Sequence, residues 1–357
     1  MKTNRYIRQI QLKEFGPVAQ RKLREANVLV VGAGGLGVPV LQYLNAMGVG
    51  TLGIVEQDRV ERTNLHRQLI YTENDLGLPK IKVAAEALSR QNEDTHIVIH
   101  DTFLVKNNAL EIIRDYDVVV DASDNFATRY LVNDACVMLK KPFIYGALHG
   151  FEGQLSVFNL NGGPTYRCVF PIMPTVLEIP NCDEQGVLGV LPGIIGSFQA
   201  LETVKVITGI GETASGKLLL YNGLDSSMYK IDIPVIKENL KIDKLASDYQ
   251  QLICDPSVQI TPEKLYSLMR EGGTIQLIDV RDAEEYNMDH LPGSKNIPLD
   301  EITNRSDELD IHYPVYLICQ SGIRSLKALH CLSETNIKFR LYNLDGGIDA
   351  FKSLVAD

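Results

Sequence analysis

A stretch of thirty residues without a single charge, from Ala26 to Val55, constrains the fold of this chain more than any other feature. Its length and composition approach those of a membrane span. It contains seven glycines and Pro39, however, and a β-branched run in it gives way to a helical spacing of apolar residues. A buried strand, a tight turn, a helix and a second strand fit this pattern better than a membrane span.

The glycines after the first expected strand have the spacing of a nucleotide-binding turn. Gly32, Gly34 and Gly37 form G-x-G-x-x-G in the segment GAGGLG, between NVLVV and a helical pattern. Glycines let the backbone approach phosphate oxygens, and the free N–H groups of the next helix favour anions. Glu56 ends the following strand, where a carboxylate can hold ribose hydroxyls. The obvious interpretation is a nicotinamide or flavin enzyme, and the alternative is a glycine turn without a ligand.

Strand and helix patterns alternate over roughly the first 230 residues. This rhythm predicts an α/β fold with a Rossmann-like, doubly wound and mostly parallel sheet. The patterns around residues 152–160 and 218–233 change to alternating strands, which predicts an antiparallel extension. The expected elements are strands at 27–34, 51–58, 96–103 and 116–124 and helices at 36–48 and 77–92.

A chain of 357 residues is too long for one ordinary core, so we expect two domains. The polar, lysine-rich stretch near residues 232–256 predicts the boundary between them. We assign 1–235 to a nucleotide-binding domain, 236–256 to a linker and 257–357 to a smaller α/β domain. In the smaller domain the patterns predict helices at 261–273 and 325–334 and strands at 275–282 and 314–322.

Composition limits the expected partners and the expected cellular compartment. A net charge of −10 disfavours a nucleic-acid-binding footprint, so we expect no nucleic-acid partner. The N-terminal residues show no apolar signal segment, and we expect no membrane partner. The cysteines form no C-x-x-C pair, which favours reduced thiols in the cytoplasm over a disulfide framework. They stand at positions 136, 168, 182, 254, 319 and 331.

Cationic residues after the second expected strand favour a nucleoside triphosphate over a dinucleotide. Arg67 and Lys80 lie there, and β- and γ-phosphates need such partners. Asp121 and Asp124 end the fourth expected strand at the sheet edge that binds ligands, where a carboxylate can hold Mg²⁺. Alternatively, the two cations are solvated surface charges and Asp124 caps a helix.

Together these motifs resemble those of the MoeB/ThiF family of adenylyltransferases, which activate ubiquitin-like sulfur carriers. The resemblance covers about residues 4 to 230. Its motifs are RYIRQIQLKEFG, GAGGLG, RTNLHRQ, GLPK, DASDNFATRYLVNDAC, EGQLSVF and GVLGVLPGIIGSFQALE. In this chain the carrier's terminal carboxylate would attack MgATP, so the resemblance implies ATP and Mg²⁺.

The resemblance also implies roles for individual residues. Arg67 and Asp124 would be catalytic, Lys80 would meet phosphate, and Asp124 would sit at the Mg²⁺. Arg8 would reach into the neighbouring subunit's site, which implies a homodimer. Glu56 stands where the family usually has Asp. The residues implied to bind the nucleotide are Gly35, Glu56, Thr63, Asn64, Leu65, His66, Arg67, Lys80, Asp124 and Asn125.

The cysteines of this chain agree only in part with the cysteines expected from the family pattern. Most relatives hold a structural zinc with two C-x-x-C pairs, but here Thr165 stands where the first cysteine is expected and only Cys254 lies in the region of the second pair. We therefore predict no such zinc. Cys182 matches an acceptor thiol of some relatives and is a candidate catalytic residue. Its acidic neighbours would raise the pKa of its thiol, and the alternative is an unreactive loop cysteine.

The segment LICQSGIRSL predicts a second site. Cys319 ends an apolar strand, and Gly322 permits a tight loop whose N–H groups can stabilise a thiolate or persulfide. Arg324 can brace this loop or attract an anionic sulfur donor. The alternative is a buried cysteine at a strand end.

This part of the chain, about residues 257 to 355, resembles the rhodanese domain in IDVR, HLPGSKNIP and LDGGI. The resemblance implies that Cys319 carries a persulfide. The related phosphatases have five residues between Cys and Arg, and the four found here favour sulfur. Asp279 and Arg281 would be structural. The implied loop is Cys319, Gln320, Ser321, Gly322, Ile323 and Arg324.

The combined expectation is an enzyme that adenylates a Gly-Gly-ended carrier and then transfers sulfur to it. The carrier is the small subunit of molybdopterin synthase, a thiamin-pathway carrier or a tRNA-thiolation modifier. The sulfur donor is a cysteine desulfurase or thiosulfate. The alternatives are an NAD(P)-dependent oxidoreductase fused to a rhodanese and a non-catalytic scaffold that docks a ubiquitin-like protein.

Overall fold

The computed structural model describes residues 5–174, 186–246, 249, 259–270, 275–333 and 339–356. They form two compact units, one with the described residues up to Tyr249 and one with those from residue 259. The first unit thus extends past residue 235. Tyr249 accounts for part of this extension, because it is 5% exposed and its hydroxyl donates to Asp134 Oδ2 at 2.7 Å.

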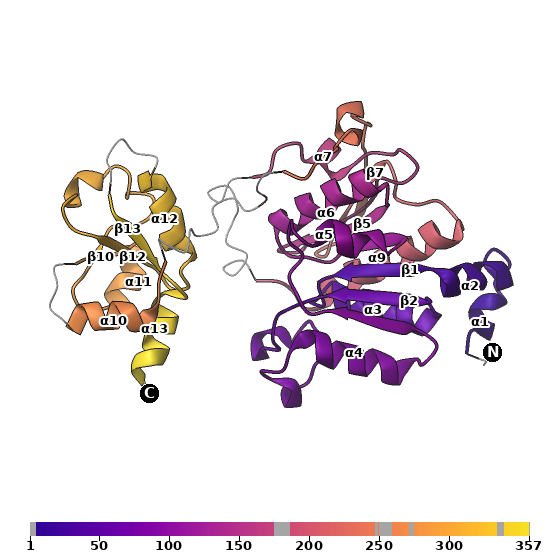
Figure 1. Ribbon diagram of the computed structural model, residues 1–357, viewed down its shortest axis with the longest axis horizontal. Helices are drawn as coiled ribbons and strands as arrows, with labels where there is room; N and C mark the ends of the chain where they lie inside the picture. Colours follow the sequence, from indigo (N-terminus) through magenta and orange to yellow (C-terminus); the bar gives the residue numbers. More distant parts are fainter. Residues whose placement is uncertain are drawn as a thin grey trace. The chain divides into compact units, whose positions relative to one another are not determined.

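The N-terminal unit is built on an eight-stranded sheet with the order β3-β2-β1-β4-β5-β6-β7-β8 (Figure 1). Neighbours from β3 to β5 are parallel, and neighbours from β5 to β8 are antiparallel. This confirms the predicted mostly parallel sheet with its antiparallel extension. The strands are β1 (Asn27–Val31), β2 (Thr51–Val55), β3 (His96–His100), β4 (Val118–Asp121), β5 (Phe143–His149), β6 (Glu152–Phe158), β7 (Lys217–Asn222) and β8 (Met228–Asp232).

Helices follow most of the parallel strands, as the sequence pattern predicts. The α-helices are α1 (Ile7–Ile10), α2 (Gly16–Glu25), α3 (Gly37–Met47), α4 (Lys80–Gln91), α5 (Ala109–Arg114), α6 (Phe126–Leu139), α7 (Tyr166–Val169) and α9 (Val190–Thr208). Short 3₁₀ turns are η1 (Arg62–Asn64), η2 (Glu73–Asp75) and η3 (Lys237–Leu240).

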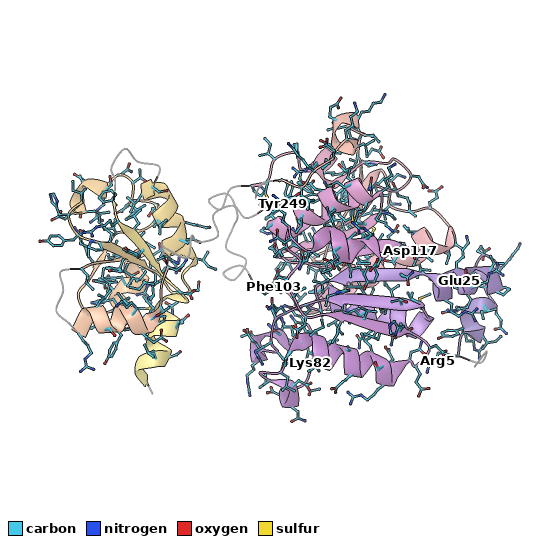
Figure 2. All side chains as sticks on the ribbon, in the orientation of Figure 1. Arg5, Glu25, Lys82, Phe103, Asp117 and Tyr249 are labelled. Carbon is cyan, nitrogen blue, oxygen red and sulfur yellow. The ribbon has the colours of Figure 1, made fainter. Side chains whose placement is uncertain are left out.

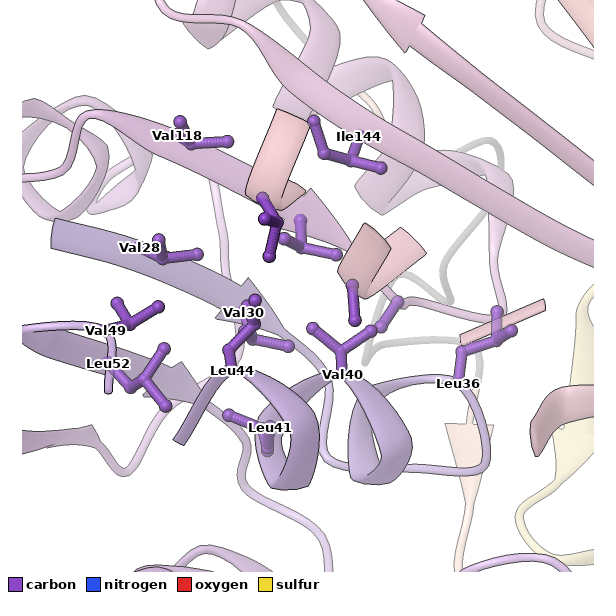
Figure 3. Close-up of a cluster of buried hydrophobic side chains, with 14 of the residues drawn as sticks. Val28, Val30, Leu36, Val40, Leu41, Leu44, Val49, Leu52, Val118 and Ile144 are labelled. Atoms are coloured by element: carbon purple, nitrogen blue, oxygen red, sulfur yellow. The ribbon is translucent and has the colours of Figure 1, made fainter. Parts of the chain in front are cut away.

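The central strand β1 explains why an uncharged sequence is needed here. Val28 and Val30 lie in one hydrophobic cluster with Leu41 and Leu44 of α3 (Figure 3). Leu29 belongs to a second cluster, with side chains of α5 and α6. Because successive side chains of a strand point to opposite faces, β1 is buried on both sides of the sheet.

Helix α9 is the one described helix that is long and apolar enough to cross a membrane by length and composition. Half of its most apolar window is buried within the protein. Ile195, Ala200 and Val204 belong to the same cluster as Val28 and Val30. The apolar character of α9 is therefore accounted for by packing against the sheet.

The C-terminal unit contains a parallel sheet with the order β11-β10-β12-β13-β9 (Figure 1). Val315 and Leu317 of β12 lie in one cluster, and Tyr316 and Ile318 in another. The strands are β9 (Gln259–Ile260), β10 (Gln276–Asp279), β11 (Ser294–Asn296), β12 (Val315–Ile318) and β13 (Leu341–Leu344). The helices are α10 (Pro262–Arg270), α11 (Ala283–Met288), η5 (Ser306–Glu308), α12 (Ile323–Ser333) and α13 (Gly347–Ala356).

Helix α12 begins at Ile323, two residues before the expected start at Ser325. Ile323 and Arg324 therefore lie in its first turn, and only the residues from Cys319 to Gly322 connect β12 to α12.

Candidate functional sites

A cavity of about 770 Å³ lies at the carboxyl ends of the parallel strands in the N-terminal unit. Phe103 lines this cavity. In Figure 2, Phe103 and Lys82 lie toward one end of the sheet, and Asp117 and Glu25 lie toward the other. In sheets of this kind ligands bind at the carboxyl end. Nine of the ten predicted nucleotide-binding residues line the cavity: Gly35, Glu56, Thr63, Asn64, His66, Arg67, Lys80, Asp124 and Asn125.

The tenth predicted residue, Leu65, has another role. It is partly buried and packs against a small hydrophobic cluster that contains Val38, Val60 and Tyr71. Leu65 therefore anchors the segment that carries Thr63 to Arg67, while its neighbours line the cavity.

The glycine turn between β1 and α3 is packed as tightly as its sequence indicates. Gly32 has a φ of +97°, which favours glycine. A Cβ atom on Gly37 would lie 1.9 Å from the carbonyl oxygen of Gly32. Gly34 and Gly35 line the cavity, so ligand atoms can approach the backbone there.

Glu56 holds this turn in place. Its Oε2 accepts a hydrogen bond from the Ala33 N–H at 3.0 Å, and its Oε1 accepts from the N–H groups of Gln57 and Asp58, both at 2.9 Å. The side chain is 8% exposed and still lines the cavity. Each carboxylate oxygen has more than one lone pair, so Glu56 can also accept from ribose hydroxyls.

Two cations face the same cavity. Lys80 Nζ lies 3.2 Å from Asp58 Oδ2, and the lysine side chain is only 7% exposed whereas that of Asp58 is 54% exposed. Arg67 Nη1 donates to the carbonyl oxygen of Thr63 at 2.9 Å. Since Lys80 and Arg67 both line the cavity, they can serve phosphate oxygens, and the donor set fits a triphosphate.

The end of β4 supplies the carboxylate side of the cavity. Asn125 is the N-cap of α6, and its side chain accepts from the Thr128 N–H at 2.9 Å. Asp124 is exposed and lines the cavity, so the helix cap proposed as its alternative role belongs to Asn125. The cavity-facing carboxylate of Asp124 is an oxygen ligand that could bind Mg²⁺ together with phosphate oxygens.

Asp121, in contrast, is fully buried and does not line the cavity. Its Oδ1 accepts from the N–H and the hydroxyl of Ser123 at 3.1 and 2.6 Å. Burial raises the pKa of Asp121. Asp121 therefore shapes the turn that carries Asp124 toward the cavity.

Sequence reasoning missed Arg129 of α6. This side chain lines the cavity, is 8% exposed and donates from Nη2 to the Ser123 carbonyl oxygen at 3.3 Å. Its Nε has no hydrogen-bond partner among the described residues. The signal was present in DASDNFATRY, because Arg129 lies one helical turn past the Asn125 cap.

Two predicted catalytic residues are not among the described residues that line the cavity. Arg8 lies in α1, is exposed and is not among the lining residues. A role in a neighbouring subunit's site stays a prediction. Cys182 lies outside the described residues, as does Cys254.

Where relatives would place zinc ligands, Cys168 accepts hydrogen bonds instead. Its Sγ lies 3.4 Å from the backbone nitrogens of Thr165 and Ile236 and 3.7 Å from Asn239 Nδ2. Burial opposes ionisation of this thiol, but the hydrogen bonds outweigh it and lower its pKa. The described residues contain no group of three or more His, Cys, Asp or Glu side chains that could hold a metal ion.

The second candidate site lies at the end of β12 in the C-terminal unit. Cys319 is 1% exposed, and its Sγ accepts from the Gly322 N–H at 3.2 Å and from the Ser325 hydroxyl at 3.3 Å. Cys319 also belongs to a hydrophobic cluster of the C-terminal unit. The loop places an N–H and a hydroxyl against the sulfur, its role in stabilising a thiolate or persulfide stays a prediction, and Arg324 lies in the helix.

The segment LDGGI is hydrogen-bonded to the backbone of this loop. The backbone N–H groups of Ile348 and Asp349 donate to the carbonyl oxygens of Cys319 and Gln320 at 2.9 and 3.1 Å. A Cβ atom on Gly347 would lie 2.4 Å from the Gln320 carbonyl oxygen. Close contact with the backbone of the loop therefore explains the glycine at position 347.

Arg281 and Asp279 form a buried ion pair beneath the loop. Arg281 Nη2 lies 2.7 Å from Asp279 Oδ2, and its Nη1 donates to Gln320 Oε1 at 2.9 Å. The arginine thus orients the residue that follows Cys319. These contacts favour the structural role that the sequence predicted for both residues.

The chain thus combines two α/β units, one with a cavity at the carboxyl ends of its strands and one with a buried cysteine at the end of a strand. Family models match the same two regions: the ThiF family at residues 6–241 and the rhodanese-like domain at residues 261–354. The chain belongs to the ThiF family and carries a C-terminal rhodanese-like domain.

Similar proteins support this assignment. "Adenylyltransferase and sulfurtransferase MOCS3" of Aedes aegypti is 42% identical, over 92% of this chain and 81% of that protein. MOCS3 of Anopheles gambiae is 40% identical, over 99% and 86%. The chain is an adenylyltransferase and sulfurtransferase, which sets aside the oxidoreductase and the scaffold.

Solved structures show the same fold at lower identity. Escherichia coli MccB bound to MccA-N7isoASN has a TM-score of 0.60 and 21% identity, over 66% of this chain and 73% of that one. MccB with ATP has a TM-score of 0.56 and 18% identity, over 64% and 74%.

Proposed function

We propose that the N-terminal domain, residues 1–235, adenylates the C-terminal glycine of a ubiquitin-like sulfur carrier with MgATP. The C-terminal domain, residues 257–357, then delivers sulfur from a persulfide on Cys319. The small subunit of molybdopterin synthase or a similar Gly-Gly-ended protein is the carrier, and the reaction takes place in the cytoplasm. The observation that carries this proposal is the convergence of Lys80, Arg67 and Asp124 on one cavity beside the glycine turn.

Each lining residue has a task in this proposal. The glycine turn and the start of α3 lie against phosphate oxygens, and Glu56 accepts from the ribose. Lys80 leaves Asp58 for a phosphate oxygen, and Arg67 binds a second one. Mg²⁺, held by Asp124 and phosphate oxygens, would neutralise charge on the triphosphate.

Adenylation itself needs no general base. The carrier's terminal carboxylate is already a nucleophile, and its oxygen forms the new bond to the α-phosphorus as the bond to the β-phosphate oxygen breaks. Pyrophosphate leaves and an acyl-adenylate remains. The protein contributes by positioning the two anions and by neutralising their charge with fixed cations.

Sulfur transfer follows. The Cys319 persulfide attacks the acyl-adenylate carbonyl and displaces AMP, giving an acyl disulfide between carrier and Cys319. A thiol then attacks Cys319 Sγ and releases the carrier thiocarboxylate, which leaves a disulfide for a cellular reductant. Cys182 is the candidate thiol. Arg8 completes the neighbouring subunit's cavity in a homodimer.

ATP–pyrophosphate exchange with Mg²⁺ and a panel of Gly-Gly-ended carriers tests the adenylation step. We expect exchange with one carrier, and its loss in Asp124→Ala. Exchange with none of the carriers would refute the proposed substrate class.

A further inference from the structure

Both arginines at the Cys319 loop are paired with carboxylates. Arg281 is held by Asp279, as described above. Arg324 donates from Nη1 to Glu285 Oε2 at 2.5 Å and from Nη2 to Glu285 Oε1 at 2.8 Å. This two-pronged arrangement uses the planar fork of the guanidinium and is among the strongest of charged hydrogen bonds.

Glu285 is built to stay in this position. It is the third residue of α11, and its Oε2 also accepts from the Asp282 N–H at 3.2 Å in a capping box. The hydrogen bonds from Arg324 lower the pKa of Glu285 below its ordinary value. The Arg324 side chain is 16% exposed and that of Glu285 is 35% exposed, so the pair lies at the protein surface beside the loop.

The exposed charges on the segment that packs against the loop are negative. Asp345 and Asp349 are exposed on the segment beneath it, and Gln320 Nε2 donates to Asp349 Oδ1. A small dianion such as thiosulfate depends on cations whose charge is not already balanced. With Arg324 held by Glu285, its charge is already balanced and attracts such an ion less strongly.

We propose that Glu285 is a specificity-determining residue of the sulfur-loading step, which disfavours thiosulfate and leaves loading to persulfide donors. This inference rests on the proposed role of Cys319. In the loading step the Cys319 thiolate attacks the outer sulfur of a donor R–S–SH. The donor S–S bond breaks, R–S⁻ leaves, and Cys319 becomes the persulfide with no net oxidation.

Loading of Cys319 can be followed as the mass gain of one sulfur atom in the full-length protein. The donors are thiosulfate and a synthetic persulfidated peptide with basic residues beside its cysteine. Glu285→Gln is compared with Glu284→Gln, which removes the same charge from the neighbouring exposed position. We expect Glu285→Gln to raise kcat/KM for thiosulfate about tenfold, mainly through KM, because one charge is unmasked.

The kcat/KM of Glu285→Gln for the basic peptide should not rise. Glu284→Gln should have the same kcat/KM as the wild type with both donors. Equal effects of the two variants, or a gain by Glu285→Gln with both donors, would overturn the assignment.

If Glu285→Gln fails to fold, the ionic-strength dependence of loading in the natural chain decides the question. Because Glu285 already balances the charge of Arg324, the rate of loading from thiosulfate should change little as salt is added. A steep fall of this rate with added salt would overturn the proposal. Full loading in Cys319→Ala would instead refute the role of Cys319, so the two failures can be told apart.

Discussion

At the scale of single residues, each candidate site contains a cation that forms an ion pair with a nearby carboxylate. Lys80 pairs with Asp58, and Arg324 pairs with Glu285. The sequence could predict Lys80 as a phosphate ligand because its motif is local. It could not predict the partner of Arg324, because 39 residues separate Arg324 from Glu285 and only the folded sheet brings them together. For the same reason it left open whether Arg324 braces the loop or attracts a donor.

Lys80 should be required for adenylation. We expect Lys80→Met to lower the rate of ATP–pyrophosphate exchange about 100-fold, because one fixed charge on the phosphates is lost. Lys82→Met, at an exposed position of the same helix, is the matched control and should keep the natural rate. Equal rates for natural protein and Lys80→Met would remove Lys80 from the site.

Cys168 should stabilise the N-terminal unit without metal. Replacing it with Ala removes the acceptor of the Thr165 and Ile236 N–H groups, and we expect a loss of about 1–2 kcal/mol in the free energy of unfolding. Thermal denaturation measures this loss. The natural protein should give the same Tm with and without a strong zinc chelator. A fall of Tm on chelation would contradict the predicted absence of zinc.

At the scale of elements, the hydrophobic pattern located the strands and helices, but several expected strands ran three or four residues past the observed ends. β1, β2 and β4 are apolar runs followed by glycine or acidic residues, and the structure places them within the expected ranges. The start of α12 was missed by two residues because Ile323 looks like a loop residue in CQSGIRS. Its backbone is set by Gly322 and by the packing of Gly346 and Gly347, which are distant in sequence.

The turn between β1 and α3 should tolerate no side chain at Gly37. We expect Gly37→Ala to cost about 3 kcal/mol or more and to abolish nucleotide binding, because its Cβ would overlap the Gly32 carbonyl oxygen. Gly193→Ala in α9 meets no atom within 4 Å and is the control. Urea denaturation and nucleotide-binding calorimetry measure the two effects. A stable, nucleotide-binding Gly37→Ala protein would disprove this account of the turn.

At the scale of the whole molecule, the two functions are carried by two compact units with separate cores. Motif order predicted this division, since nucleotide motifs precede residue 230 and sulfur motifs follow residue 257. The contribution of Tyr249 was not predictable, because it comes from a polar stretch that reads as a linker. Its hydroxyl bonds to Asp134, which also pairs with Arg167, and its side chain belongs to a hydrophobic cluster of the first unit.

The N-terminal unit should therefore fold better with residues 236–249 than without them. We expect a protein of residues 1–249 to unfold several degrees above one of residues 1–235, because Tyr249 and the Cys168–Ile236 contact are kept. Differential scanning calorimetry makes the comparison. Tyr249→Phe in the longer protein should lose part of this gain in Tm, because the bond to Asp134 is removed. Identical Tm values for the two lengths would show that these residues add nothing.

The burial of Cys319 affects how long sulfur could stay bound there between loading and transfer. With 1% of the residue exposed, oxidants and small thiols in solution reach its sulfur slowly. Under the role proposed for Cys319, sulfur loaded there would be held in reserve, so a donor and an acceptor would not need to be present at the same moment. The protein can then buffer an irregular supply of sulfur and release it whenever an activated acceptor arrives.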